Sequence, residues 1–365
     1  MRSDLTYSLP DFPPTIPDDT AAEPAAPADA PEFRRDPVTG RWVVIAPERS
    51  LRPIALEGAE PRHRANGERR PCPLCPGQEH DTPNEVLALR APGSQPDGPG
   101  WRLRVVPNKF PAVRPLPGGT HKDGDLLDRA PGYGRHEVVI ETPEHLANPT
   151  RLSDDHFRDV LLAYRDRLLA LSADVHLRYA TVFKNVGAEA GASLGHAHSQ
   201  ILATPLVPDA IREELGGADT YYTTNRRCVF CDILRSELAD GRRVVAESPQ
   251  FVAISPFAAR FAYEMWVLPR AHASRYESVT AEAAAELAGL MKRVLRGLDA
   301  VLAEPAYNWF LHTGPLRSAE LPYYHWHFEV TPRTARAAGF EWGAGCFINA
   351  VAPETAAAQL RDAIM

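Results

Sequence analysis

The segment between Gly187 and Gln200 carries residue types suited to chemistry at phosphorus. Three glycines, at positions 187, 191 and 195, form a loop whose backbone N–H groups can approach a phosphate closely. A strand is expected after this loop, and since alternate strand residues share a face, His196, His198 and Gln200 should point the same way. A histidine beside a phosphate is a nucleophile at phosphorus, and a neighbouring amide can donate to the non-bridging oxygens as charge develops. The segment therefore predicts a histidine that acts as a nucleophile at phosphorus.

Four of the five cysteines stand in two Cys-x-x-Cys pairs, and each pair is followed by two histidines at matched distances. The two sets are Cys72, Cys75, His145 and His196, then Cys228, Cys231, His272 and His325. A Cys-x-x-Cys turn lets two thiolates reach one ion, and zinc prefers four tetrahedral sulfur and nitrogen ligands. Because protein residues fill all four positions, the sequence predicts about two structural zinc ions per chain. The alternative is a pair of buried or redox-active thiols without metal in each half.

His196 belongs both to the His-x-His-x-Gln segment and to the first group of metal ligands. This overlap assigns different roles to His196 and His198. If His196 is the fourth ligand of the first metal group, His198 is the nucleophile. Gln200 then contacts the transferred group, and Ser193 in the loop could do the same. A lone histidine is more often a hydrogen-bonded core residue, but the glycine loop and the His-x-His-x-Gln pattern favour the catalytic role.

The order of these motifs in residues 33–208 recurs in residues 209–365. His145 and His196 lie 51 positions apart, and His272 and His325 lie 53 apart. Apolar periodicity predicts a helix over 154–171 with Ser153 as its N-cap, and a second helix over about 280–303. Strand patterns occur at 41–46, 101–106, 137–141, 180–184 and 200–204, whereas 50–100 is rich in Pro, Gly and Arg and predicts a loop. The sequence thus predicts an α+β fold whose two antiparallel-sheet halves join into one pseudo-symmetric globule, with helices packed on the sheet.

Composition limits the class of protein. The chain has 365 residues, 44% of them hydrophobic, and a net charge of −7. The acidic balance argues against a nucleic-acid partner, and no apolar run reaches the length of about 18 residues that crosses a membrane. Residues 1–32 are rich in Pro, Ala and Asp and predict a disordered tail without the apolar core of a secretory signal. A cytoplasmic protein is expected.

The stretch Gly-Ala-Ser-Leu-Gly-His-Ala-His-Ser-Gln, residues 191–200, resembles the active-site motif of the galactose-1-phosphate uridylyltransferase branch of the histidine-triad superfamily. The run from Asp36 to Pro53, the first Cys-x-x-Cys pair and Thr142-Pro-Glu-His145 are also similar to that family. The resemblance extends over about residues 33–362 and implies a duplicated histidine-triad-like unit. It implies that a nucleotide sugar nucleotidylates His198 and releases a sugar 1-phosphate. A second phosphate acceptor then takes the nucleotidyl group, which is a ping-pong reaction.

The resemblance also implies which residues surround the nucleotide and its phosphates. They are Arg49, Arg52, Asn108, Asn185, Ser193 and Gln200. The two arginines match a pyrophosphate in charge and fork geometry, although without the resemblance they would be interpreted as a solvated basic turn. Some members of the family are dimers, so a homodimer is consistent with the resemblance.

Two departures from the uridylyltransferase pattern leave the nucleobase and the acceptor open. His312, His325 and His327 match a His-rich second metal site of bacterial relatives, but Cys228 and Cys231 favour zinc here. The C-terminal stretch 339–349 looks more like the ADP-glucose phosphorylase relatives. The first expectation is a uridylyltransferase that uses UDP-glucose and galactose 1-phosphate. The alternatives are an ADP-glucose phosphorylase, a histidine-triad nucleotide hydrolase, and a non-enzymatic zinc-binding scaffold.

The second half is expected to be a degenerate copy. It has His327-Phe-Glu329 where the first half has His198-Ser-Gln200, and it lacks the glycine loop. A glutamate in place of Gln200 would repel phosphate.

Overall fold

The computed structural model describes residues 32–45, 71–115 and 132–364. Two sheets organise these residues. A small sheet has the strand order β1-β2-β13, formed by β1 (Glu32–Arg35), β2 (Trp42–Ile45) and β13 (Phe347–Asn349). A ten-stranded sheet has the order β3-β4-β5-β7-β6-β11-β12-β10-β9-β8. Its strands are β3 (Leu87–Arg90), β4 (Trp101–Pro107), β5 (Arg135–Ile140), β6 (Tyr179–Val186), β7 (His198–Thr204), β8 (Val244–Glu247), β9 (Phe251–Ile254), β10 (Met265–Pro269), β11 (Tyr307–His312) and β12 (His327–Pro332).

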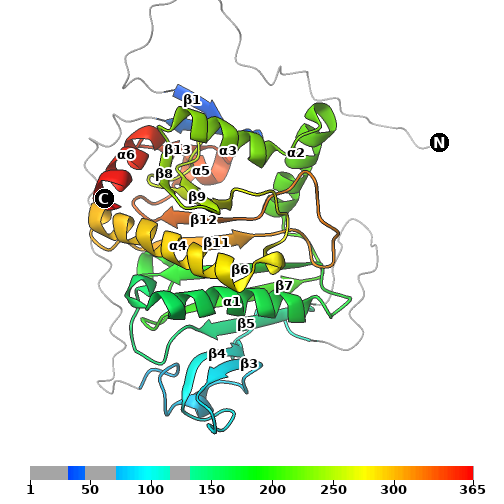
Figure 1. The fold of residues 1–365 in the computed structure, drawn as a ribbon, viewed down its shortest axis with the longest axis vertical. Helices are drawn as coiled ribbons and strands as arrows, with labels where there is room; N and C mark the ends of the chain where they lie inside the picture. Colours follow the sequence, from blue (N-terminus) through cyan, green and yellow to red (C-terminus); the bar gives the residue numbers. More distant parts are fainter. Residues whose placement is uncertain (1–31, 46–70, 116–131, 365) are drawn as a thin grey trace, which may run out of the picture.

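Each half of the chain contributes five strands to the large sheet in the same relative order. This order is β3-β4-β5-β7-β6 from one edge and β8-β9-β10-β12-β11 from the other. Strands β3 to β7 belong to the first half of the chain, strands β8 to β12 to the second, and the two sets meet where β6 pairs with β11. All pairings within this sheet are antiparallel. Figure 1 shows the single continuous sheet that results. The predicted fold, two antiparallel halves joined into one pseudo-symmetric globule, is confirmed.

Two long helices cover one face of the sheet. Helix α1 (Asp154–Leu171) and helix α4 (Ala281–Leu302) lie side by side across it (Figure 1). Each begins at a hydroxyl N-cap, because Ser153 accepts a hydrogen bond from the backbone N–H of His156 and Thr280 from that of Ala283. The apolar stripe of each helix is buried against the strands. The predicted helix over 154–171 agrees with α1 at both ends.

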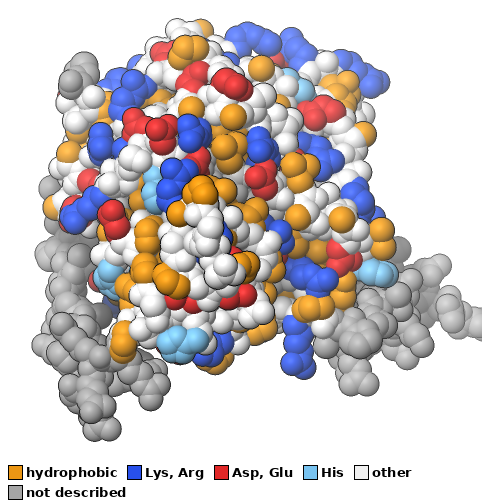
Figure 2. All heavy atoms as spheres, turned by 60° about the horizontal axis from the view of Figure 1, so that its bottom comes forward, with side chains coloured by type: hydrophobic (Ala, Val, Ile, Leu, Met, Phe, Trp, Pro, Cys, Tyr) orange, Lys and Arg blue, Asp and Glu red, His pale blue; other side chains and the backbone are white. Residues whose placement is uncertain are grey.

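The remaining helices belong to the second half of the chain. They are α2 (Asp209–Asn225), α3 (Val229–Asp240), α5 (Gly339–Ala344) and α6 (Pro353–Ile364). Within the described parts of the chain, each helix is too short or too polar to span a lipid bilayer. On the face shown in Figure 2, Lys and Arg side chains are mixed with Asp and Glu side chains.

The prediction of a loop over 50–100 was wrong at β3. This strand lies within that stretch and pairs with β4, so that Leu87 stands opposite Val105. The strand β3 is stabilised by backbone hydrogen bonds to β4. The composition of residues 87–90 alone does not reveal this pairing. The predicted strand at 41–46 corresponds to β2, while most of the predicted N-terminal tail lies outside the described residues.

A buried ion pair lies where β5, β6 and β7 meet. Lys184 Nζ on β6 lies 2.8 Å from Glu141 Oε2, one residue beyond β5, and the two side chains are 1% and 0% exposed. The same ammonium donates to the backbone carbonyl of His198 at 3.0 Å. Burial lowers the pKa of Lys184, and the charge of Glu141 opposes that shift. The pair therefore holds the first residue of β7 against both neighbouring strands.

Removing one member of this pair should destabilise the protein strongly. Glu141→Gln leaves the Lys184 ammonium buried without a counter-charge, and we expect the free energy of unfolding to fall by about 3–5 kcal/mol. Urea unfolding followed by circular dichroism measures the change. Adding Lys184→Met removes the second charge and should recover most of the loss.

The matched control is an exposed pair. Arg151 and Glu304 are both 65% exposed at 3.4 Å, so Glu304→Gln should cost less than about 1 kcal/mol. Equal losses for the two glutamate variants would show that the buried pair contributes no more than a surface contact.

Candidate active site and metal centres

His198 is the first residue of β7, and its imidazole is held in one tautomer. Its Nδ1 lies 2.7 Å from the backbone carbonyl oxygen of His196. A carbonyl only accepts, so Nδ1 must carry the proton and Nε2 keeps its lone pair. Burial lowers the pKa of His198, and the nearby charge of Lys184 lowers it further. Burial therefore favours the neutral imidazole, and its tautomer leaves the lone pair on Nε2.

The strand that carries His198 and Gln200 does not include His196, which the sequence pattern predicts to lie on it. Because β7 begins at His198, His198 and Gln200 share a face of the strand, but His196 lies in the bend before it. Strand alternation therefore does not apply to His196. Its Nδ1 instead lies near the first cysteine pair.

Two of the three glycines in the loop that precedes β7 have a positive φ. Gly187 and Gly191 have φ values of 82° and 87° and flank a short turn of 3₁₀ helix, Ala188–Ala190. A side chain at Gly187 would clash, since a Cβ there would lie 2.7 Å from the Cβ of Ala306. Ser193 is exposed in this loop, so its hydroxyl is accessible to a ligand.

The second half of the chain supports this loop through a residue that sequence reasoning missed. Asn308 on β11 donates to Asn185 Oδ1 at 2.7 Å and to the carbonyl of Ala190 at 2.8 Å. Asn185 Nδ2 in turn lies 3.5 Å from the carbonyl of Gly191. Asn185 and Asn308 are opposite each other where β6 pairs with β11. Only the pairing of the two halves reveals this contact, because the residues are 123 positions apart.

The other predicted substrate residues divide into two groups. Asn108 follows β4 and its Nδ2 lies 3.4 Å from Gln200 Oε1, so these two predicted residues are brought together. His136, which had no predicted role, lies beside both. Arg49 and Arg52 lie outside the described residues.

The first predicted metal group is assembled. The ligand atoms of Cys72, Cys75, His145 and His196 all lie within 4.8 Å of one another. Cys75 Sγ lies 3.3 Å from His145 Nδ1 and 3.6 Å from His196 Nδ1, and Cys72 Sγ lies 3.7 Å from His196 Nδ1. A tetrahedral zinc with ordinary bond lengths requires about 3.6 Å between such ligand atoms. His196 Nε2 lies 2.7 Å from the carbonyl of Thr142, which leaves Nδ1 unprotonated for a metal.

The second predicted group repeats this arrangement with Cys228, Cys231, His272 and His325. Cys231 Sγ lies 3.5 Å from His272 Nδ1 and 3.7 Å from His325 Nδ1. The Nε2 atoms of the two histidines lie 3.1 Å and 2.9 Å from backbone carbonyls. Both donor sets therefore fit zinc.

His327 in the second half is the counterpart of His198. Its Nδ1 lies 3.0 Å from the carbonyl of His325, so the same tautomer is fixed. Its Nε2 is buried without a hydrogen-bond partner among the described residues and faces Glu214 and Glu329 at 3.9 Å and 3.8 Å. With His312, these three residues form a further group that could hold a cation.

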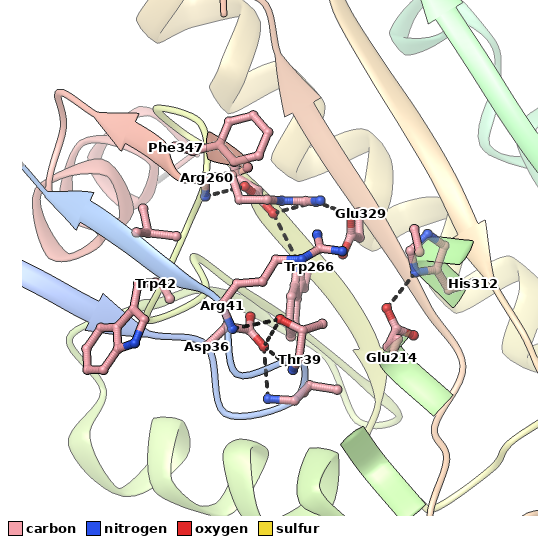
Figure 3. Close-up of a pocket in the computed structure, with 16 residues that line it drawn as sticks. Asp36, Thr39, Arg41, Trp42, Glu214, Arg260, Trp266, His312, Glu329 and Phe347 are labelled. Atoms are coloured by element: carbon pink, nitrogen blue, oxygen red, sulfur yellow. Dashed lines mark hydrogen bonds and ion pairs between the residues drawn. The ribbon is translucent and has the colours of Figure 1, made fainter. Parts of the chain in front are cut away.

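The second-half site is lined by carboxylates, and the cavity beside it is small. Figure 3 shows the cavity beside it, with Arg260 directed toward Glu329 and His312 joined to Glu214. Its volume is about 40 Å³, enough for one or two water molecules. Although burial opposes ionisation, the charge of Arg260 holds the pKa of Glu329 below its usual range. An ionised carboxylate thus stands where the first half has the Gln200 amide.

Comparison with known proteins agrees with this geometry. Residues 23–208 match the family model for the N-terminal domain of galactose-1-phosphate uridyl transferase, and residues 214–362 match that for its C-terminal domain. An ADP-glucose phosphorylase of Arabidopsis thaliana is 36% identical, over 91% of this chain and 93% of its own. A galactose-1-phosphate uridylyltransferase of Thermotoga maritima is 28% identical, over 91% and 98%.

Solved structures agree as well. The crystal structure of an Arabidopsis thaliana ADP-glucose phosphorylase with bound ADP-glucose has a TM-score of 0.76 and 34% identity, covering 91% of this chain and 99% of that one. A uridylyltransferase structure has a TM-score of 0.71 and 30% identity, with coverage of 91% and 98%. The chain belongs to the galactose-1-phosphate uridylyltransferase family.

Proposed function

We propose that this protein transfers a nucleotidyl group from a nucleotide sugar to a phosphate acceptor through a covalent intermediate on His198. The observation that carries the proposal is the fixed tautomer of His198, whose Nε2 is the unprotonated atom beside a glycine loop. In the first step Nε2 attacks the α-phosphorus, the new N–P bond forms, and the bond to the sugar-phosphate oxygen breaks. The sugar 1-phosphate leaves. In the second step a phosphate oxygen of the acceptor attacks phosphorus and the N–P bond breaks.

Three side chains are positioned to bind the transferred group. The Gln200 amide shares the strand face of His198 and can donate to a non-bridging oxygen. Ser193 and Asn185 belong to the glycine loop and the strand before it, and they complete the polar side of the site. We assign Arg49 and Arg52 to the pyrophosphate on the resemblance alone.

We propose ADP-glucose as the donor and inorganic phosphate as the acceptor. The support is the higher identity to the ADP-glucose phosphorylase, 36% against 28% for the uridylyltransferase at equal coverage of this chain. The second candidate is transfer of a uridylyl group from UDP-glucose to galactose 1-phosphate. It is favoured by the family models, which match both halves of the chain.

Covalent labelling tests the proposal and separates the two candidates. Without an acceptor, ADP-glucose labelled at the α-phosphate should label the protein and release glucose 1-phosphate in equal amount. Labelled UDP-glucose should react more slowly. His198→Ala should abolish the label, whereas His176→Ala, an exposed histidine in the turn after α1, should not. The intact intermediate is measured by mass spectrometry.

The acceptor is identified by adding inorganic phosphate or galactose 1-phosphate to the labelled protein. The effective acceptor removes the label as a nucleoside diphosphate or as a nucleotide sugar. A wild type that neither nucleotide sugar labels would refute the transferase and favour a zinc-binding scaffold. Loss of the label to water as fast as to either acceptor would favour a hydrolase.

We propose that zinc fills both Cys₂His₂ groups. Metal analysis should find about two zinc equivalents per chain, since each group supplies four protein ligands. Cys72→Ser should remove one equivalent and Cys228→Ser the other, with a lower melting temperature in each variant. Cys346→Ser is the matched control, because Cys346 belongs to neither group. Cation that survives in a Cys72→Ser/Cys228→Ser double variant would instead occupy the group of Glu214, His312, His327 and Glu329. A metal-free protein with unchanged stability would contradict the structural role.

A further inference from the structure

His136 lies at the start of β5 and links a loop to Gln200 through its two ring nitrogens. The backbone N–H of Ala112 donates to His136 Nδ1 at 3.1 Å. A backbone N–H can only donate, so Nδ1 is the unprotonated nitrogen and Nε2 carries the proton. This proton is directed at Gln200 Oε1, which lies 2.8 Å from Nε2.

Asn108 approaches the same oxygen. Its Oδ1 accepts from the backbone N–H of Phe110 at 2.9 Å, which turns its Nδ2 toward Gln200 Oε1 at 3.4 Å. The 3.2 Å separation of Asn108 Nδ2 from His136 Nε2 is therefore a contact between two donors that share one acceptor. The backbone N–H of Asn108 also donates to the carbonyl of His136 at 2.7 Å. Loop and strand are thus fixed to each other on both sides of the imidazole.

These contacts determine the orientation of the Gln200 amide. Two donors occupy the space on one side of the side chain, so its oxygen must face them and its NH₂ group must face away. The Gln200 amide nitrogen has no hydrogen bond to any other described residue, which leaves it available to a ligand. The reverse orientation would direct the oxygen at a phosphoryl group and repel it.

We propose that His136 is a positioning residue, which holds the Gln200 amide with its NH₂ group toward the phosphoryl group on His198. The inference rests on the proposed function, in which Gln200 donates to that phosphoryl group. His136 itself touches neither the nucleophile nor the transferred atoms.

A double-mutant cycle tests this inference. The rate of covalent labelling is measured in a single turnover with ADP-glucose or UDP-glucose, whichever labels the wild type. Gln200→Ala should slow labelling by about 10²–10³-fold, the usual effect of losing one oriented donor. His136→Phe keeps the ring but removes the donor, and should slow labelling by about tenfold, the usual effect of one lost hydrogen bond. The double variant should be no slower than Gln200→Ala alone, because His136 acts only through Gln200.

Further variants separate positioning from a general loss of structure. His136→Gln places an amide donor near the position of Nε2 and should restore most of the rate. Ala112→Pro removes the N–H that fixes the tautomer, in an exposed part of the loop, and should slow labelling only when Gln200 is present. His176→Phe is the control and should label at the wild-type rate. Circular dichroism and metal content should match the wild type in each variant.

The outcomes are distinguishable. An unlabelled wild type overturns the proposed function, and this inference with it. A labelled wild type in which the His136→Phe and Gln200→Ala effects multiply, or in which His136→Phe has no effect, overturns the positioning role alone. If His136→Phe does not fold, the same double-mutant cycle is measured with Ala112→Pro and Gln200→Ala. Effects that multiply would again overturn the positioning role.

Discussion

The hydrogen bond from His198 Nδ1 to the carbonyl of His196 is the contact on which the proposed active site depends. It fixes which nitrogen of His198, the proposed nucleophile, is free. The residue that supplies the carbonyl is itself a member of the first metal group, where its Nδ1 faces Cys72 and Cys75. Its Nε2 is held in turn by the carbonyl of Thr142. A metal at this group would therefore position the acceptor that sets the tautomer of the nucleophile, without taking part in the chemistry.

The second half contains the equivalent hydrogen bond, but its surroundings differ from those of His198. His327 donates to the carbonyl of His325 just as His198 does to that of His196. Around His198, however, stand a glycine loop and an amide, whereas around His327 stand two carboxylates and a cavity of about 40 Å³. Since carboxylates repel a phosphate, the repeated geometry is unfavourable for a nucleotide there. The second half also supports the first, since Asn308 donates hydrogen bonds to Asn185 and to the carbonyl of Ala190 in the loop.

Local patterns in the sequence predicted the features whose partners lie along the same segment or recur at matched spacing. The helix over 154–171 followed from apolar periodicity and a serine cap, and the two Cys₂His₂ groups followed from the repeated spacing of their ligands. Several unpredicted contacts depend on the order of strands in the sheet. Lys184 contacts Glu141, and Gln200 contacts His136, although the residues of each pair are 43 and 64 positions apart in the chain. Spacing along one strand gives the face of a residue but not its neighbour on the next strand. For the same reason the sequence could not show that β3 has a partner.

The identity of residue 200 also bears on which acceptor can complete the proposed reaction. Water is a poor nucleophile unless a nearby base removes its proton. The Gln200 amide has no basic atom, and the neighbouring imidazole of His136 carries its proton on Nε2, the nitrogen that faces Gln200. Neither group can therefore activate a water molecule at this position. A phosphate acceptor needs no such activation, because its oxygens are already anionic. In the proposed reaction this position therefore supplies no base for hydrolysis, which favours transfer to a phosphate acceptor.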